Sequence, residues 1–287
     1  MTTTDRMVPR SPLGILASAT ATHGTGRDDD IALPKLPGFV ESAFSPLAYE
    51  VGERCLTEWP GDGARTAVAL ASMTGDTTTA DLASRRMVSG RVHNPLLFMQ
   101  ATANSVLGHI SREFGITGQM FSLSTLDDPL TELLAMADLL LEDTELDRVL
   151  VLGVELGGGA RVAAVHRELA LDGGRPVPDL PVSAGLAAAA LLGRPGDAGA
   201  PVSVRTAGTA YGTGAARRLG SIQGLFDLAD AHRRLLRDGG THLLATEPEE
   251  PAFILGSGAE ARSHSGAGSG TGTRDTARNE TETHAHQ

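Results

Sequence analysis

The segment from Asn94 to Pro129, NPLLFMQATANSVLGHISREFGITGQMFSLSTLDDP, decides the fold of this chain. Its apolar residues recur at helical spacing over 96–113, which predicts one long helix, and the glycines that follow predict a turn. The short apolar run 120–124 then predicts a strand. The segment therefore has the order helix, turn, strand, and a second helix follows from Pro129.

The turn between that strand and the second helix contains Leu126, Asp127 and Asp128. Proline fits the first turn of a helix, and an aspartate just before it can accept hydrogen bonds from the free N–H groups of the helix. We expect Asp127 or Asp128 to cap the helix. Many α/β enzymes expose a nucleophile at such a turn, but this turn offers only carboxylates.

The rest of the chain alternates in the same way between predicted strands and predicted helices. Strands are expected at 13–21, 66–72, 148–154, 184–192, 202–210, 241–246 and 252–255, and helices at 48–59, 76–85, 129–141 and 222–237. Alternating strands and helices are typical of the α/β class, and the continuous apolar strands are typical of a mostly parallel sheet between helices.

Composition divides the chain into a foldable part and a tail. Residues 1–256 contain the predicted elements, whereas residues 257–287 are rich in Gly, Ser, Thr, Ala, Arg and Glu and have almost no large apolar side chain. Such a segment cannot bury enough surface to offset the entropy of ordering it. We expect one domain over 1–256 and a disordered tail over 257–287, whose His284 and His286 are solvated rather than bound to a metal.

Charge and cysteine content exclude several classes of function. The formal net charge is −11 and Lys35 is the only lysine, so the sequence lacks the clustered basic patch of a nucleic-acid-binding protein. The longest apolar run is about half the length of a membrane span. One cysteine and no signal peptide fit a cytoplasmic protein. His109 and His166 have no metal partners at ligand spacing, so we expect no metal and no cofactor.

Several motifs in order resemble β-ketoacyl synthases of the thiolase-like superfamily. In that family an Asn-Pro pair, a helix with an Asn, a Phe/Tyr-Gly-(Leu/Ile)-x-Gly-Pro turn and an apolar strand lead to the nucleophile in Thr-Ala-Cys-x-Ser-Gly. This chain matches with Asn94-Pro95, Asn104, 114–118 and Ser124-Thr125, and it continues with VLVLGVE at 149–155 and an alanine-rich strand at 183–192. The matches cover about residues 60–215, and Asp127 falls at the position of the family's nucleophilic Cys.

The resemblance implies the thiolase-like fold, reduced to one ketosynthase half. The chain is too short for the second half that carries the family's catalytic histidines. A ketosynthase half without nucleophile or histidines resembles a chain length factor, the non-catalytic subunit that pairs with a true β-ketoacyl synthase in type II polyketide biosynthesis, here of the polyene kind, or in a fatty-acid-like system. The implied partners are a ketosynthase and, through the complex, an acyl carrier protein.

The same resemblance assigns two groups of residues. The segment after the 66–72 strand borders the acyl tunnel, so the expected gate residues are Met73, Thr74, Thr77, Thr78 and Thr79. Thiolase-like subunits pair through the strand before the nucleophile and the preceding helix. The expected interface residues are therefore Ala101, Asn104, Val106 and Phe121.

Two other functions stay open from the sequence. An independent acyl-thioester enzyme could use Asp127, Ser124 or Cys55, although Cys55 lies on the apolar face of a predicted helix, where a thiol usually behaves as a small hydrophobic side chain. A nucleotide-binding α/β protein could use the glycines around Gly157, but they lack the GxGxxG spacing, and VAAVH rather than a capped helix follows them.

Overall fold

The computed structural model describes residues 7–90, 95–125, 128–173, 180–196, 199–209, 219–245 and 251–257. Eight strands form one sheet with the order β3-β2-β4-β5-β1-β6-β8-β7. The strands are β1 Leu13–His23, β2 Thr66–Ala71, β3 Met120–Leu123, β4 Arg148–Leu156, β5 Gly185–Gly193, β6 Val202–Thr209, β7 Thr241–Ala245 and β8 Pro251–Ser257.

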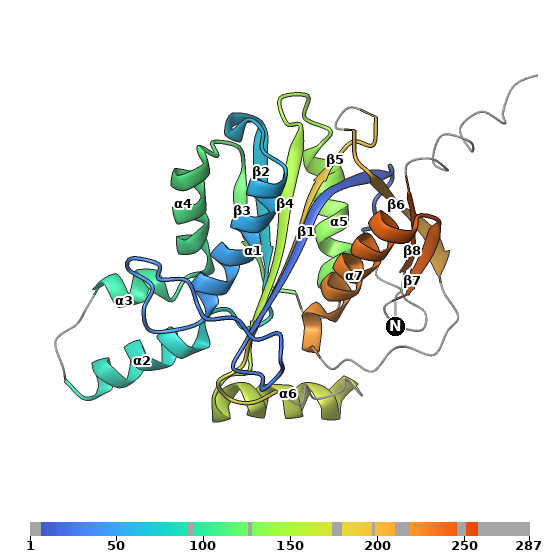
Figure 1. Cartoon of the computed structure of the whole chain (residues 1–287). Helices are drawn as coiled ribbons and strands as arrows, with labels where there is room; N and C mark the ends of the chain where they lie inside the picture. The colour runs from blue at the N-terminus through green and yellow to red at the C-terminus, as the bar shows by residue number, and fades with distance from the viewer. Residues whose placement is uncertain are drawn as a thin grey trace, which may run out of the picture.

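Helices cover both faces of this sheet (Figure 1). They are α1 Phe44–Glu58, α2 Thr77–Val88, α3 Pro95–Gln100, α4 Ala103–Phe114, α5 Pro129–Leu140, α6 Ala160–Gly173 and α7 Gln223–Asp238, with short 3₁₀ turns η1 Gly63–Arg65 and η2 Gly220–Ile222. α1 and α4 pack on one face and α5 and α7 on the other, while α6 lies across one end of the sheet and α2 and α3 project at one side. The α/β class predicted from the sequence is confirmed.

The alternation of side chains along the strands builds two separate cores. In β2, Ala67 and Ala69 face the core under α5 and α7, whereas Val68 and Leu70 face the core under α1 and α4. Successive side chains of a strand point to opposite faces, so a strand covered on both sides must be apolar throughout. β4 and β5 are accordingly buried at every residue.

The prediction of a mostly parallel sheet is wrong, because most of the neighbouring strands are antiparallel. β2 is parallel to β3 and to β4, but β4 with β5, β5 with β1, β1 with β6, β6 with β8 and β8 with β7 are all antiparallel. The continuous apolar runs were interpreted as parallel strands. They show only that helices cover both faces, and such burial produces the same pattern whichever way a neighbouring strand runs.

The predicted long helix over 96–113 is also wrong, because two helices replace it. Between α3 and α4, Thr102 has an extended backbone (φ −88°, ψ 132°). The hydroxyls of Thr102 and Ser105 both donate to the carbonyl oxygen of Met99, and the two hydroxyls also bond each other. Such side-chain bonds to the main chain compete with helix continuation. α4 then ends as expected at Gly115, which has a φ of 63° that favours glycine.

One helix that the sequence did not predict follows β4. α6 begins at Ala160, directly after Gly157–Gly159, and it contains the VAAVH segment at 162–166, where no capped helix was expected. The last strand, β8, ends at Ser257, one residue past the predicted limit of the domain. The expected tail from residue 258 onward lies outside the described residues.

Asp138 of α5 ties three parts of the fold together. Its carboxylate accepts hydrogen bonds from the N–H groups of Arg10 (2.7 Å) and Ser11 (3.2 Å), just before β1, and pairs with the guanidinium of Arg194, just after β5. Burial would raise the pKa of Asp138, but these hydrogen bonds outweigh it and lower the pKa below its ordinary value of 3.8. The stabilisation is therefore present above the ordinary pKa and is lost as the pH falls through the lower, folded value.

We predict that Asp138→Ala lowers the free energy of unfolding at pH 7 by about 3 kcal/mol, because it leaves Arg194 and two N–H groups without their partner. Urea unfolding followed by circular dichroism measures the change. Glu142→Ala, at an exposed carboxylate just after the same helix, is the control and should stay within about 0.5 kcal/mol of the parent chain. Equal effects of the two substitutions would show that the contacts of Asp138 contribute no more to the free energy of unfolding than those of an exposed carboxylate.

Candidate functional site

The carboxyl ends of the three parallel neighbours β2, β3 and β4 bring together most of the residues that the sequence singled out. The segment 73–79 follows β2, Ser124 and Thr125 follow β3, and Glu155 lies near the end of β4. Sites in α/β proteins form at such an edge, because loops after adjacent parallel strands meet there. We therefore treat these strand ends as the candidate site.

Glu155 is the buried acid of this site, and it was not among the site residues expected from the sequence. It is 6% exposed, and its carboxyl accepts hydrogen bonds from the N–H of Met73 (2.6 Å) and the hydroxyl of Ser221 (2.8 Å). Burial raises the pKa of Glu155 to about 7, although the bonds from Met73, Ser221 and Ser72 act in the opposite direction. Near neutral pH the side chain is therefore divided between its charged and neutral forms.

A glycine in β4 lets Ser221 come this close. A Cβ atom on Gly153 would lie 2.3 Å from Cδ1 of Leu225 and 2.9 Å from Cγ2 of Ile222. Only a residue without a side chain lets η2 and the start of α7 pack directly on this strand. The close approach at Gly153 thus places the Ser221 hydroxyl over Glu155, two residues further along β4.

The backbone of Met73 is held on both sides. Glu155 binds its N–H, and the hydroxyl of Ser124 donates to its carbonyl oxygen at 3.1 Å. The N–H of Ser72 also donates to the carbonyl of Leu123 at 3.1 Å, which extends the β2–β3 ladder to the start of the segment. Residues from three adjacent strand ends therefore fix the point where the chain leaves β2.

The threonines of the expected gate fall into different environments. Thr79 is buried, and its N–H and hydroxyl bind the carboxylate of Asp76, the N-cap of α2, so its polar groups belong to the helix cap. Thr78 is exposed. The hydroxyls of Thr74 and Thr77 are buried, and neither bonds any atom of the described residues.

At the turn after β3, the helix cap is Asp128. Its side chain accepts hydrogen bonds from the N–H and the hydroxyl of Thr131, as expected for one of the two aspartates. Thr125 is buried, and its hydroxyl likewise has no partner in the described parts of the chain. Asp127, at the position of the expected nucleophile, lies outside the described residues, as does Leu126.

The expected interface residues do not share one surface. Val106 is 0% exposed and packs in the chain's own core with side chains of α1, β2 and β4, so its assignment to a partner interface is wrong. Asn104 is exposed, Ala101 is half-buried, and Phe121 is half-buried against the other core. The exposed apolar side chains of this region lie instead on α2, α3 and β3, at Met87, Val88, Leu96, Phe98, Met99 and Met120.

Cys55 is enclosed by the core between α1 and the sheet. It is 0% exposed, and burial, with a smaller contribution from Glu58, raises the pKa of its thiol far above the ordinary value. Thiolate is the reactive form of cysteine, so this environment disfavours nucleophilic chemistry.

Contacts within the chain explain the glycine at position 157, after β4. The N–H of Gly157 donates to the carbonyl of Ala184 at 2.7 Å, and a Cβ atom on Gly157 would lie 2.0 Å from the carbonyl oxygen of Pro181. A helix does follow these glycines, contrary to the argument made from the sequence. However, the close contact with Pro181 and the bonded N–H account for Gly157 without a nucleotide.

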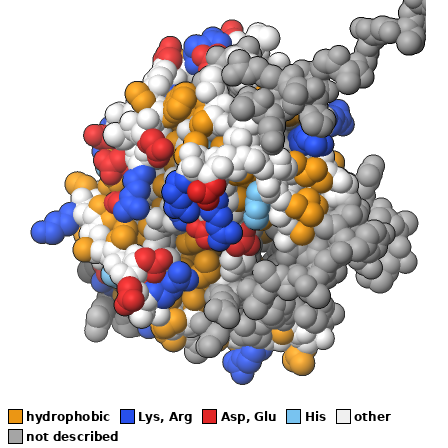
Figure 2. All heavy atoms as spheres, turned by 45° about the vertical axis from the view of Figure 1, so that its right-hand side comes forward, with side chains coloured by type: hydrophobic (Ala, Val, Ile, Leu, Met, Phe, Trp, Pro, Cys, Tyr) orange, Lys and Arg blue, Asp and Glu red, His pale blue; other side chains and the backbone are white. Residues whose placement is uncertain are grey.

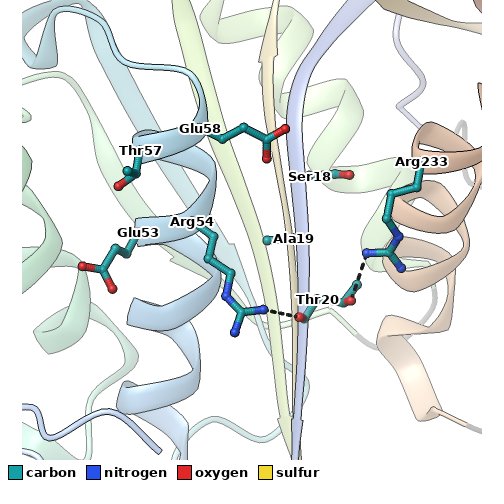
Figure 3. Close-up of a pocket in the computed structure, with 8 residues that line it drawn as sticks. All are labelled: Ser18, Ala19, Thr20, Glu53, Arg54, Thr57, Glu58 and Arg233. Carbon is teal, nitrogen blue, oxygen red and sulfur yellow. Dashed lines mark hydrogen bonds between the residues drawn. The ribbon is translucent and has the colours of Figure 1, made fainter. Parts of the chain in front are cut away.

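A groove of about 560 Å³ opens elsewhere, between α1, β1 and α7 (Figure 3). Arg54 donates to the carbonyl of Thr20, and Arg233 donates to its hydroxyl. Glu53 and Glu58 also line the groove, so its charges are mixed. On the face that Figure 2 presents, Arg and Lys side chains are likewise intermingled with Asp and Glu.

A serine–histidine pair adjoins this groove and was not anticipated from the sequence. The hydroxyl of Ser18, which lines the groove, lies 2.8 Å from Nδ1 of His232. Burial, with a smaller effect of Arg233, lowers the pKa of His232 to about 4, so the imidazole is neutral and a weak base. Its Nε2 bonds no atom of the described residues, so the pair has no carboxylate to complete a triad.

Within the described ranges, no group of three or more His, Cys, Asp or Glu side chains is placed to hold a metal ion. Nor does any described helix have the length and apolar character needed to cross a membrane.

The sequence matches no protein-family model and no curated protein, but the structure resembles solved ketosynthase complexes. One is a ketosynthase (ApeO) in complex with its chain length factor (ApeC) from Xenorhabdus doucetiae, with a TM-score of 0.54 and 16% identity over 85% of this chain and 99% of that chain. The ishigamide ketosynthase/chain length factor matches with a TM-score of 0.54 and 13% identity over 77% and 82% of the two chains.

A third match is AntDE:AntF, a type II PKS acyl-carrier protein in complex with its ketosynthase bound to the hexaketide. The TM-score is 0.57, with 11% identity over 86% of this chain and 100% of that chain. At such low identity these matches establish the fold: the chain has the thiolase-like fold found in ketosynthase and chain length factor complexes.

We predict that native Cys55 reacts with iodoacetamide at least about 100-fold more slowly than the same cysteine in the urea-unfolded chain, because burial keeps it as the thiol. Mass spectrometry of timed samples measures the rates. Ser84→Cys in a Cys55→Ala background, on the exposed face of α2, is the control and should react as a free thiol. Fast labelling of native Cys55 would reopen a nucleophilic role.

Proposed function

We propose that this chain is a non-catalytic subunit that pairs with a β-ketoacyl synthase and acts as a chain length factor in type II polyketide biosynthesis of the polyene kind or in a fatty-acid-like system. One observation carries the non-catalytic part. The only cysteine of the chain is enclosed in the core beside α1, whereas the strand-end turn after β3 continues from Thr125 into Leu126 and Asp127. The resemblance to ketosynthase and chain length factor complexes supports the pairing.

The proposed partner surface combines the edge of the sheet with the projecting helices. β3 stands at one end of the strand order, and its only described strand neighbour is β2. α4 packs against β3 and also contacts α3, whose Leu96, Phe98 and Met99 are 61%, 67% and 61% exposed. Adjacent α2 adds Met87 and Val88. An exposed apolar helix surface and a strand edge that no described strand covers are both typical of protein interfaces.

The acyl carrier protein is a partner of the proposed complex rather than of this chain alone. The AntDE:AntF structure, which contains an acyl-carrier protein together with its ketosynthase, supports this arrangement. We propose a cytoplasmic location, as expected from the single cysteine of the sequence.

The two alternatives have weaker support. An acyl-thioester enzyme would need an activated nucleophile, but the hydroxyl of Ser124 donates to the carbonyl of Met73 and Cys55 is buried as the thiol. A nucleotide site would need the free N–H groups of a glycine loop, but that of Gly157 is bonded within the chain.

We predict a 1:1 complex with the cognate ketosynthase that Phe98→Asp weakens by about 30-fold or more, as expected for the loss of a central aromatic contact and the burial of an unpaired charge. Isothermal titration calorimetry measures the affinity. Leu171→Asp, at an 86% exposed apolar residue of α6, is the matched control and should bind as the parent chain does. A parent chain that stays monomeric in the presence of the ketosynthase contradicts the proposed function.

We predict that Thr77→Phe shifts the products of the complex to shorter chains. A ring at this half-buried position overfills the space beside the gate, and overpacking costs roughly 1–3 kcal/mol, which disfavours the longest intermediates about 10-fold to 100-fold. Product analysis by liquid chromatography and mass spectrometry measures the shift. Ser84→Phe adds the same ring to the exposed face of α2 and should leave the products unchanged. Unchanged products with Thr77→Phe in an intact complex would show that the segment 73–79 does not control chain length.

A further inference from the structure

Glu155 is a buried carboxyl that neither the overall fold nor the pairing of subunits explains. Desolvation opposes the charged form, and the opposing contributions to its pKa are all hydrogen bonds, from Met73, Ser221 and Ser72. A buried carboxyl without a cationic partner is costly to keep, and such groups cluster where a protein uses them. We therefore ask which groups the carboxyl of Glu155 binds.

The carboxyl holds the first residue of the gate. The N–H of Met73 donates to it at 2.6 Å, while the Ser124 hydroxyl binds the carbonyl of the same residue at 3.1 Å. With both polar groups of Met73 bound, the peptide planes on either side of it have little freedom. We refer to Glu155, Met73 and Ser124 as the gate clamp.

The position of Met73 is transmitted to the rest of the gate. The N–H of Gly75 donates to the hydroxyl of Ser72 at 2.9 Å, and Asp76 then caps α2 through Thr79. Gly75 has a φ of 66°, a conformation that keeps the turn tight. A shift at Met73 therefore carries with it Thr74, in the turn, and the first turn of α2, which begins at Thr77.

The other end of the clamp is anchored in the core. Ser221 donates to the carboxyl of Glu155 at 2.8 Å from η2, which the Gly153 contact packs against β4. Glu155 thus connects the gate to the helical layer formed by α5 and α7 rather than to solvent-exposed loops.

We propose that Glu155 is the positioning residue of the gate. By holding Met73 against β3 and β4, it fixes the depth of the space that the growing acyl chain enters, and so it sets chain length without touching the substrate. This inference rests on the proposed function. Because a neutral amide oxygen can accept the same bonds, a glutamine at 155 should hold the gate as the acid does, whereas an alanine should release it.

The first arm of the test uses the purified chain alone. Amide hydrogen exchange at Met73 should be about tenfold faster in Glu155→Ala than in the parent chain, and unchanged in Glu155→Gln. Thr66→Val is the control for general loss of stability, since it removes a buried hydroxyl bonded to Arg148 at the opposite end of β2. Unchanged exchange at Met73 in a folded Glu155→Ala chain would overturn the clamp.

The second arm uses the complex with the ketosynthase. Glu155→Ala should lose the single dominant product and give a spread of chain lengths, with an affinity for the ketosynthase within about twofold of the parent chain, while Glu155→Gln and Thr66→Val keep the parental pattern. A parental pattern from an intact Glu155→Ala complex would overturn the inference even if exchange at Met73 had changed.

Two further outcomes are an unfolded Glu155→Ala chain and a parent chain that does not bind the ketosynthase. If Glu155→Ala does not fold, Ser124→Ala removes the other half of the clamp from an exposed position, and parental exchange and products there would overturn the inference. If the parent chain binds no ketosynthase, the proposed function fails and the role in chain length fails with it. The exchange at Met73 still shows separately whether the clamp exists.

Discussion

Burial of β4 and β5 along their whole length, on both faces, is the constraint on which the rest of this structure depends. A strand covered by helices on both sides can carry no polar side chain along its middle without a partner, so its interior is Val, Leu, Ala and Gly. The four alanines of β5, Ala187–Ala190, keep both helical layers close to the sheet. The charged side chains of β4, Arg148 and Glu155, accordingly lie at or next to the ends of the strand.

The same constraint explains what the sequence could and could not predict. Apolar periodicity located every strand and most helices, because a buried face requires apolar residues at the spacing of its strand or helix. It could not give strand direction, since β5 is as apolar antiparallel to β4 as it would be parallel. The break before α4 depends on the hydrogen bonds from the hydroxyls of Thr102 and Ser105 to the carbonyl of Met99. These bonds form only in the folded structure, so the spacing of residues could not predict them.

The strands that lead to the candidate site could be predicted from the sequence, because their apolar residues lie next to one another. The role of 73–79 as a gate came from the family resemblance and stays a prediction. Glu155 could not be assigned a role, since its partners Met73 and Ser221 are 82 and 66 residues away and meet it only after the sheet and η2 have formed. Val106 was misassigned for the related reason that helical periodicity shows an apolar face but not which neighbour covers it. Here that neighbour is the chain's own core.

β3 connects the two halves of the proposed function. α4 packs against it and also contacts α3, which carries exposed apolar side chains, while the hydroxyl of Ser124, the first residue beyond its end, donates to the carbonyl of Met73. A partner that pairs with the outer edge of β3 would press on the same short strand that supports one side of the gate clamp. Under the proposed function, subunit pairing and gate position would therefore be linked through the four residues of β3, Met120–Leu123. Under the proposed function, such a link would let a chain whose only cysteine is buried affect what its partner makes.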